Sequence, residues 1–298
     1  MEAAPGFIAK QIELADTEVA RPDSRACPVC ANQGLELPRY RNIGLAQCED
    51  CGLVFHGRTP GNARDAYVSG EYVARNVDYV EEERAAEHIA EQRADWLLQF
   101  TSPGTLLELG SGRGFFLDAV GRRDFEPIGV EPSPDLAGRA IRDFGVEVKQ
   151  GFLDEVDLAG RRFDSVCMFH VFEHVEEPVG LLDQVAERLA GRGLLVLEVP
   201  NIASAMARRR AEGWGAVQPG NLHITQFTPE SLRSVVERAG FEVIGIDTIA
   251  PWHYIPPADR WRHRALLGYA YRAATLRTLR VTHASGFDHL RLVARAAR

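Results

Sequence analysis

The stretch from Thr105 to Pro132, TLLELGSGRGFFLDAVGRRDFEPIGVEP, constrains the fold more than any other part of the chain. It opens with the apolar run Leu106–Leu109 after a Pro-Gly turn signal, a pattern that predicts a buried parallel strand. Alternating glycines then lead into an apolar, helix-like segment from Phe115 to Val120, and a second short strand ends in Glu131. The order strand, glycine turn, helix, strand and acid is typical of the nucleotide-binding half of a doubly wound α/β sheet.

The spacing of glycines and acids indicates which part of a ligand this turn binds. The pattern is E-x-G-x-G-x-G, with Glu108 inside the strand end, and differs from the dinucleotide pattern G-x-G-x-x-G. A pyrophosphate favours free backbone N–H groups with no carboxylate beside them, whereas an acid suits a cationic group such as an ammonium. Glu131 lies 17 residues after the last glycine, where it can accept hydrogen bonds from both hydroxyls of a ribose.

This stretch resembles the first two motifs of class I S-adenosylmethionine-dependent methyltransferases, in which the glycine loop passes under the amino-acid part of the cofactor. The resemblance implies a mostly parallel, seven-stranded, doubly wound Rossmann-like sheet, and S-adenosylmethionine held by Glu108, Gly110, Ser111, Gly112, Gly114, Glu131 and Pro132. It also implies that Phe152 and Leu153 pack against the adenine and that Asp154 reaches its amine, while Phe169 and His170 line the cofactor. An ordinary strand-to-helix turn is the alternative.

Four of the five cysteines form a second motif near the N-terminus. They are spaced as C-x2-C, seventeen residues, then C-x2-C, at Cys27, Cys30, Cys48 and Cys51. We see no secretion signal in the N-terminal sequence, so this spacing predicts a zinc site rather than disulfides. A module of about 40 residues is too small to be stable through its core alone, so the metal would hold it together. We expect a structural ribbon that buttresses the catalytic domain; recognition of nucleic acid or of a partner is the alternative.

Composition limits the classes of partner. The chain has 298 residues and a net charge of −8, which argues against nucleic acid as a bulk partner. The charge is uneven, since residues 257–298 carry nine Arg and two Asp. No apolar run approaches the length of a membrane span, so we expect a cytoplasmic protein without a transmembrane helix. The sequence leaves the oligomeric state open.

The chain divides into four parts by pattern. We expect an N-terminal arm, a zinc module, a helical connector and a methyltransferase domain with two inserts, at residues 1–20, 21–60, 61–101 and 102–298, with the inserts at about 202–226 and 250–285. Helices are predicted at Pro134–Phe144, from about Pro178 to Arg188 and at Thr228–Ala239. The last strand, Phe287–Ala294, is the one that the resembled family inserts antiparallel.

The string FHVFEHVEEP follows the fourth predicted strand and resembles the post-strand motif of ubiquinone-type and related small-molecule methyltransferases. Members with E-x-x-E-H can hold a divalent cation there, but this chain has H-x-x-E-H, and the loss of a hard oxygen ligand puts magnesium in doubt. We therefore expect His174 to be the general base, with Glu173 orienting it. Capping of the following helix is the alternative role for these two residues. His223 is the second candidate base, and otherwise a hydrogen-bonded wall residue, whereas His170 would lie along the cofactor.

The remaining polar residues concern the acceptor. Arg208, Arg209 and Arg210 lie in the first insert and suit an anionic group, because guanidinium forks match phosphate and carboxylate; a solvated face is the alternative. Tyr72 could wall a substrate pocket, with core packing between the zinc module and the catalytic domain as the alternative. Asn201 projects from the end of the fifth strand.

A four-Cys ribbon joined to this core also resembles sugar and natural-product methyltransferases, over about residues 25 to 245. The C-methylating sugar enzymes carry a further large domain that we do not find here, which weakens C-methylation and favours O- or N-methylation. We expect O-methylation of a sugar, nucleotide sugar or natural product. N- or C-methylation, a zinc-ribbon RNA methyltransferase and a binding protein with a vestigial cofactor site are the alternatives.

Overall fold

A computed structural model describes residues 26–57, 63–70, 83–218, 222–249 and 287–297. The predicted N-terminal arm, Tyr72 and the predicted insert at 250–285 lie outside these residues. Within the described ranges, no helix combines the length and the hydrophobicity that a bilayer crossing requires.

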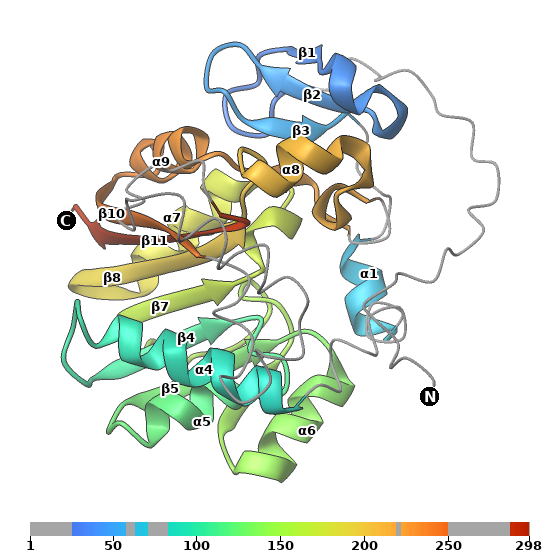
Figure 1. Cartoon of the computed structure of the whole chain (residues 1–298). Helices are drawn as coiled ribbons and strands as arrows, with labels where there is room; N and C mark the ends of the chain where they lie inside the picture. The colour runs from blue at the N-terminus through green and yellow to red at the C-terminus, as the bar shows by residue number, and fades with distance from the viewer. Residues whose placement is uncertain (1–25, 58–62, 71–82, 219–221, 250–286, 298) are drawn as a thin grey trace, which may run out of the picture.

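The larger sheet has seven strands in the order β10-β11-β8-β7-β4-β5-β6 (Figure 1). All neighbouring strands pair in parallel except β11, which is antiparallel to both β10 and β8. The strands are β4 (Thr105–Leu109), β5 (Glu126–Glu131), β6 (Glu147–Gln150), β7 (Phe163–Phe169), β8 (Leu189–Pro200), β10 (Phe241–Ile249) and β11 (His289–Ala296). The predicted doubly wound, mostly parallel sheet with one antiparallel strand is therefore confirmed.

Helices cover both faces of this sheet, because successive strand residues point to opposite sides. In β4, Leu106 packs with α4 and α5, whereas Leu107 joins the core on the face covered by α7 and α9. Helix α6 lies beside α5 over β5 and β6 (Figure 1). The helices are α4 (Glu83–Leu97), α5 (Phe115–Gly121), α6 (Pro134–Phe144), α7 (Pro178–Arg188) and α9 (Pro229–Arg238).

The helix ends follow the local sequence signals. Ser133 accepts a hydrogen bond from the Leu136 amide at the start of α6, and Gly145 ends this helix in a left-handed conformation. Thr228 and Ser231 form a reciprocal capping box at the start of α9. The predicted bounds of α6 and α7 match the structure, and those of α9 differ by one residue at each end.

The cysteine ribbon is a smaller sheet with strands β1 (Gly34–Glu36), β2 (Leu45–Cys48) and β3 (Val54–His56), and with the 3-10 helix η1 (Pro38–Ile43) between β1 and β2. Its fourth strand is β9 (Thr225–Gln226), which comes from the first predicted insert and pairs antiparallel with β3. The sequence pattern treats these segments as separate, whereas the fold joins them in one sheet.

The rest of this insert packs on the ribbon. It contains α8 (Ala205–Arg210) and the short 3-10 helices η3 (Ala211–Gly213) and η4 (Gly215–Val217). The sequence of the insert is largely polar, yet its apolar residues form a buried hydrophobic cluster with residues of the ribbon. The cluster comprises Tyr40, Leu45, Val54, Ile202, Ala207, Trp214 and Val217. Two short elements complete the fold near the sheet's carboxyl edge: α1 (Ala63–Val68) in the connector and η2 (Phe172–His174) after β7.

Candidate active site

The glycine turn lies at the carboxyl end of β4, and its three glycines have different surroundings. Gly110, Gly112 and Gly114 all have positive φ, at 69°, 53° and 82°. A Cβ on Gly110 would lie 2.4 Å from Val171 Cγ2, and one on Gly114 would lie 2.8 Å from Ala140 Cβ. A Cβ on Gly112 would meet nothing within 4 Å. Two glycines therefore permit close packing, and Gly112 leaves its backbone open to a ligand.

Glu131 ends β5 beside this turn and is buried. Its two carboxylate oxygens accept hydrogen bonds from the amides of Gly112 and Ser133, each at 2.8 Å. Burial raises the pKa of Glu131 to about 7, although both amides act in the opposite direction. Each carboxylate oxygen can accept a further hydrogen bond, so the group fits a ribose diol.

Glu108 is buried in β4, and its Oε2 has no hydrogen-bond partner among the described residues. Burial raises the pKa of Glu108 well above its usual range; Arg93 opposes this shift and Glu131 adds to it. A buried acceptor without a partner is costly, and an ammonium donor would satisfy it. The site therefore fits the cationic end of S-adenosylmethionine on one side and its ribose on the other. Pro132 directly follows Glu131, and Ser111 lies in the glycine turn after Glu108. Ser111 Oγ is another buried atom with no partner in the described ranges.

The turn after β6 carries the residues expected at the adenine. Arg64 of α1 donates to both carboxylate oxygens of Asp154, at 2.7 and 3.1 Å, and thereby lowers the pKa of Asp154. The same guanidinium carbon lies 3.9 Å from the centre of the Phe152 ring. Leu153 is buried in the core below. The sequence pattern gave no sign of Arg64, because nothing local relates residue 64 to residue 154.

His170 follows β7 and lies between two buried acids. Its Nδ1 is 3.3 Å from Glu173 Oε1, and its Nε2 is 3.4 Å from Glu198 Oε1. Burial alone would lower the pKa of His170, but the bonds to Glu173 and Glu198 outweigh it and raise the pKa to about 9. His170 is therefore an imidazolium at neutral pH. Its φ of 57° is left-handed, and its amide donates to the Glu198 carbonyl at 2.8 Å.

Glu198 is fully buried in β8 and joins three cations. Arg291 Nε donates to its Oε2 at 2.7 Å, and Arg93 and His170 contact its Oε1. Arg93 also lies over the ring of Phe169, with 4.3 Å between the guanidinium carbon and the ring centre. Sequence analysis missed this network. The available signal was an acid inside the apolar run LLVLEVP, since a buried acid requires a partner.

His174 and His223 are oriented by backbone carbonyls. His174 Nδ1 lies 3.1 Å from the Leu222 carbonyl, and His223 Nδ1 lies 2.7 Å from the Ala216 carbonyl. Because a carbonyl can only accept, each Nδ1 carries the proton and each Nε2 is the basic nitrogen. Burial lowers the pKa of both histidines, that of His223 to about 3, so both are neutral at physiological pH. The two imidazole rings pack edge to face, with their centres 4.6 Å apart.

Glu173 does not orient His174 as expected. Its hydrogen bond goes to His170, and the Leu222 carbonyl orients His174. Although burial opposes it, the hydrogen bond to His170 and the positive charge of His170 lower the pKa of Glu173 to about 2. Glu173 Oε1 lies 3.9 Å from His223 Nε2. Glu173 and His174 do not cap the following helix either, since α7 begins after Glu177 without a side-chain cap.

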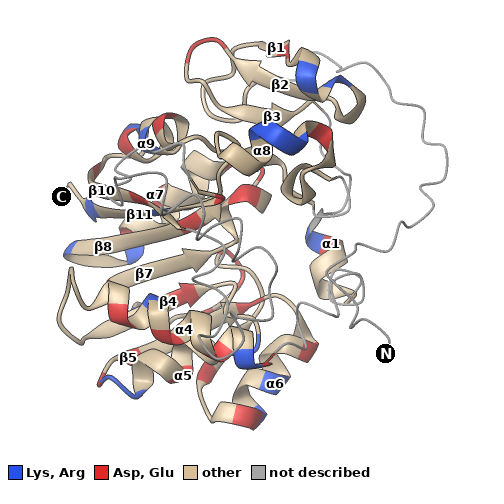
Figure 2. Cartoon of the chain, in the orientation of Figure 1, with Lys and Arg blue, Asp and Glu red and all other residues tan. Residues whose placement is uncertain are grey.

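The residues expected to bind the acceptor are placed as follows. Asn201 is fully buried, donates to the Phe287 carbonyl at 2.8 Å and accepts from the Ala203 amide at 3.0 Å, which fits a structural role. Arg208, Arg209 and Arg210 are exposed at the end of α8, and Arg208 donates to the Ala203 carbonyl. Figure 2 shows this basic segment next to the ribbon.

Among the described residues, two groups of side chains could hold a metal ion. The sulfur atoms of Cys27, Cys30, Cys48 and Cys51 all lie within 4.8 Å of one another. Three of the sulfur–sulfur distances are 3.5, 3.3 and 3.8 Å, close to the edge of about 3.8 Å in a zinc–thiolate tetrahedron. A second group is Glu173, His174 and His223, whose ligand atoms meet the same limit. Imidazole nitrogens suit a first-row transition metal better than magnesium, so this set also argues against magnesium.

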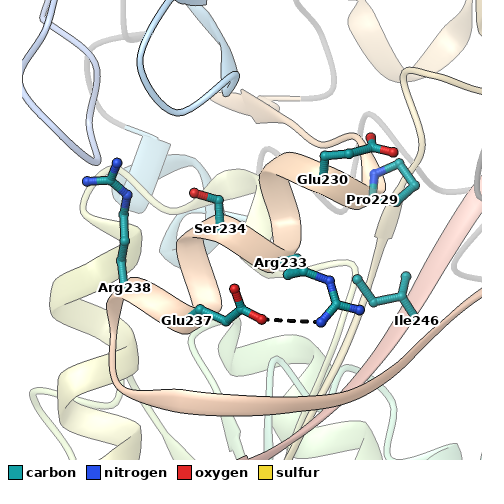
Figure 3. A pocket seen from close by; sticks show the side chains of 7 residues that line it. All are labelled: Pro229, Glu230, Arg233, Ser234, Glu237, Arg238 and Ile246. Atoms are coloured by element: carbon teal, nitrogen blue, oxygen red, sulfur yellow. Dashed lines mark hydrogen bonds and ion pairs between the residues drawn. The ribbon is translucent and has the colours of Figure 1, made fainter.

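A surface hollow of about 590 Å³ lies between α9 and β10 (Figure 3). Arg233 and Glu237 form an ion pair of 3.2 Å in it. None of the residues expected for methyl transfer lines this hollow, so we do not assign the reaction to it.

Comparison with known proteins shows the family to which the chain belongs. Residues 80–246, more than half of the chain, match a methyltransferase-domain family, and the chain belongs to that family of S-adenosylmethionine-dependent methyltransferases. It is 29% identical to a ubiquinone biosynthesis O-methyltransferase of Azorhizobium caulinodans, over 53% of this chain and 65% of that protein, just under two thirds of its length. Its identity to the Cereibacter sphaeroides protein of that name is 27%, over 56% of this chain and 71% of that protein.

Solved structures share the fold. A putative methyltransferase in complex with the Trm112 activator of Haloferax volcanii has a TM-score of 0.55 and 19% identity, over 76% of this chain and 97% of that one. A possible histamine N-methyltransferase of Thermotoga maritima has a TM-score of 0.52 and 20% identity, over 76% and 99%. Magnesium protoporphyrin IX methyltransferase of Synechocystis, with bound S-adenosylhomocysteine, has a TM-score of 0.53 and 14% identity, over 78% and 97%.

Proposed function

We propose that this enzyme methylates an oxygen atom of a small polar metabolite, such as a sugar, a nucleotide sugar or a natural product. A neutral histidine, His174 or His223, accepts the acceptor's proton. The observation that carries this proposal is the fixed tautomer of both rings, since each Nδ1–H is bound to a backbone carbonyl and each Nε2 is basic. The ubiquinone-type relatives, whose name specifies O-methylation, support an oxygen acceptor.

The residues divide the work of this reaction. Glu131 and Glu108 would bind the ribose and the ammonium of S-adenosylmethionine, and the open backbone at Gly112 would pass beneath it. Methyl transfer needs the acceptor oxygen in line with the methyl carbon, so positioning supplies most of the rate. As the new O–CH3 bond forms and the S–CH3 bond breaks, the hydroxyl proton passes to the histidine Nε2.

The charge of Glu173 favours this proton transfer, whereas the positive charge of His170 opposes it. Glu173 is ionised, and its charge acts to raise the pKa of both His174 and His223 against the effect of burial. The imidazolium that forms during the reaction would therefore face a carboxylate. The exposed arginines of α8 are the candidates for contact with an anionic part of the acceptor, such as a phosphate.

A second mechanism uses the same three residues as ligands. Glu173 Oε2 is buried and has no partner among the described residues, and it lies with the two histidines in a group that could hold a divalent cation. When bound, such a cation would polarise the acceptor hydroxyl, and the histidines would then act as ligands rather than as bases. The four-Cys group is proposed to hold a structural zinc ion.

A screen of nucleotide sugars and phenols with labelled S-adenosylmethionine tests the proposal. With an acceptor identified, His174→Asn and His223→Asn should each keep cofactor binding, and the variant that lacks the base should lose about 10²- to 10⁴-fold in turnover. Full turnover in both variants would refute a histidine base. Turnover that a chelator abolishes, and that one added transition metal restores, would favour the second mechanism. Methylation only of nitrogen or carbon, or only of RNA, would overturn O-methylation of a small metabolite.

A further inference from the structure

We infer that the four-Cys ribbon positions residues 222–227, here called the catalytic loop, which contain His223 and the carbonyl that orients His174. The short strand β9 lies in this loop and pairs with the ribbon. Strand β3 pairs with β9 in antiparallel register, with Val54 opposite Gln226 and Phe55 opposite Thr225. The pairing continues one residue further, where the His56 amide donates to the Ile224 carbonyl at 2.9 Å. The ribbon thus fixes the backbone of residues 224–226.

The other side of this segment contacts the proposed catalytic residues. The Ile224 amide donates to the Glu173 carbonyl at 2.8 Å, and Thr225 Oγ1 donates to the same carbonyl at 3.4 Å. The Leu222 carbonyl orients His174, and His223 is the residue between these contacts. Residues 222–225 therefore hold both η2 and the two histidines in place.

Packing makes this connection rigid on both faces of the ribbon. Phe227, next to β9, stacks on Phe172 of η2 with ring centres 5.3 Å apart, in the core cluster that also contains Phe55 and three of the cysteines. On the opposite face, the Ala216 carbonyl accepts from His223 Nδ1 and from Gln226 Nε2, at 2.7 and 2.9 Å.

Two further bonds tie the ribbon to the insert that carries this carbonyl. Asn42 donates through its amide N–H and its side chain to the two oxygens of Glu212, each at 2.7 Å. Glu131 and Gly112, which we propose to contact the cofactor, lie on β5 and in the turn after β4, in the other half of the sheet. Loss of the zinc ion should therefore loosen the catalytic loop and leave the cofactor half intact.

Hydrogen exchange of the full chain tests this inference without an acceptor. When a chelator removes zinc, or when Cys48→Ser weakens the site, amide exchange in a peptide covering 222–227 should accelerate about tenfold or more. Exchange in β4 and β5 should stay the same, and binding of S-adenosylhomocysteine should change less than about twofold. Unchanged exchange at 222–227 would overturn the inference. So would equal acceleration throughout the domain together with lost cofactor binding, because the ribbon would then be required for the whole fold.

Thr225→Val tests the link without disturbing the metal. The hydroxyl bond to Glu173 is lost at nearly constant volume, so exchange at 222–227 should rise about three- to tenfold, the value of one buried hydrogen bond. Thr225→Ser keeps the hydroxyl and should behave like the wild type. Arg238→Gln removes the exposed ion pair with Asp50 of the ribbon and should leave exchange unchanged. Identical exchange in the Val and Ser variants would refute the link.

The catalytic consequence rests on the proposed function, whereas the exchange measurement does not. Coupled exchange in a protein that methylates no small acceptor would refute the proposed function alone. Methylation of a small acceptor without coupled exchange would refute the ribbon's positioning role alone.

Discussion

His170 Nδ1 lies 3.3 Å from Glu173 Oε1, and this bond decides which histidine can act as a base. A second acid, Glu198, contacts the other ring nitrogen of His170, so this ring carries a positive charge at neutral pH. His174 and His223 each have a backbone carbonyl at Nδ1 and are neutral, because burial lowers the pKa of both. Three histidines of similar burial thus have different charges, because their hydrogen-bond acceptors differ.

His170→Asn should therefore destabilise the fold in a pH-dependent way. The pKa of His170 is raised to about 9, so its stabilisation is complete below about pH 6.5 and is lost as the pH rises through 9. Urea unfolding should show a loss of about 1–3 kcal/mol at pH 7 and a smaller loss at pH 9.5. An equal loss at both pH values would contradict a charged His170. Nitrogen NMR should show both ring nitrogens protonated at pH 7.5.

Cofactor binding should strengthen as the pH rises through about 7. The ribose hydroxyls donate to Glu131, so binding favours the ionised carboxylate, and burial has raised its pKa to about 7. Glu108 acts in the same direction, because its pKa is also raised and the ammonium favours its charge. Calorimetry with S-adenosylhomocysteine in buffers of different ionisation enthalpy should detect proton release.

Glu131→Gln is the control for this pH dependence. It keeps the shape of the side chain but cannot ionise, so the share of the pH dependence of binding that comes from residue 131 should disappear. Glu131→Ala should bind the cofactor markedly more weakly, because charge-assisted hydrogen bonds are worth about 1.5–3 kcal/mol each. Wild-type affinity in Glu131→Ala would rule out the ribose assignment.

Gly110→Ala and Gly112→Ala should fail in different ways, although both positions have positive φ. A Cβ added at Gly110 would lie 2.4 Å from Val171 Cγ2, so Gly110→Ala should lower the melting temperature more than Gly112→Ala does. At Gly112 the space is open, so only the backbone strain of about 1 kcal/mol remains, while the methyl group blocks the ligand. Thermal unfolding and cofactor titration together separate these effects. Normal cofactor affinity in Gly112→Ala would place the cofactor elsewhere.

Arg64→Ala should strengthen cofactor binding, by less than about fivefold. Arg64 lies over Phe152 and pairs with Asp154, the two residues expected at the adenine. Both charges are half exposed, and such a pair is worth at most about 1 kcal/mol. Arg161→Ala breaks a comparable exposed pair with Glu147 and serves as the control. Weaker binding in Arg64→Ala would mean that Arg64 contributes to the adenine pocket instead of competing with it.

Local patterns predicted much of the fold. The apolar run with Glu108, the alternating glycines and the terminal acid Glu131 predicted the β4–α5–β5 unit, because strand burial, positive φ and helix starts each leave a signal within a few residues. The paired C-x2-C motifs likewise predicted the cysteine cluster. Helix bounds were accurate where a proline and a cap mark the start, as at Pro134.

The amino-acid sequence by itself determined the fold class, the glycine loop and the cysteine cluster, since these depend on residues close together in the chain. Only the tertiary structure decided the charge of His170, the tautomers of His174 and His223, the pairing of Arg64 with Asp154 and the addition of β9 to the ribbon. Glu198 and Arg291 lie 93 residues apart in the chain, and β3 and β9 are also far apart. The tautomer and the charge of a histidine depend on which hydrogen-bond acceptors lie beside its ring nitrogens. Those acceptors come from distant parts of the chain, so the order of residues alone does not reveal them.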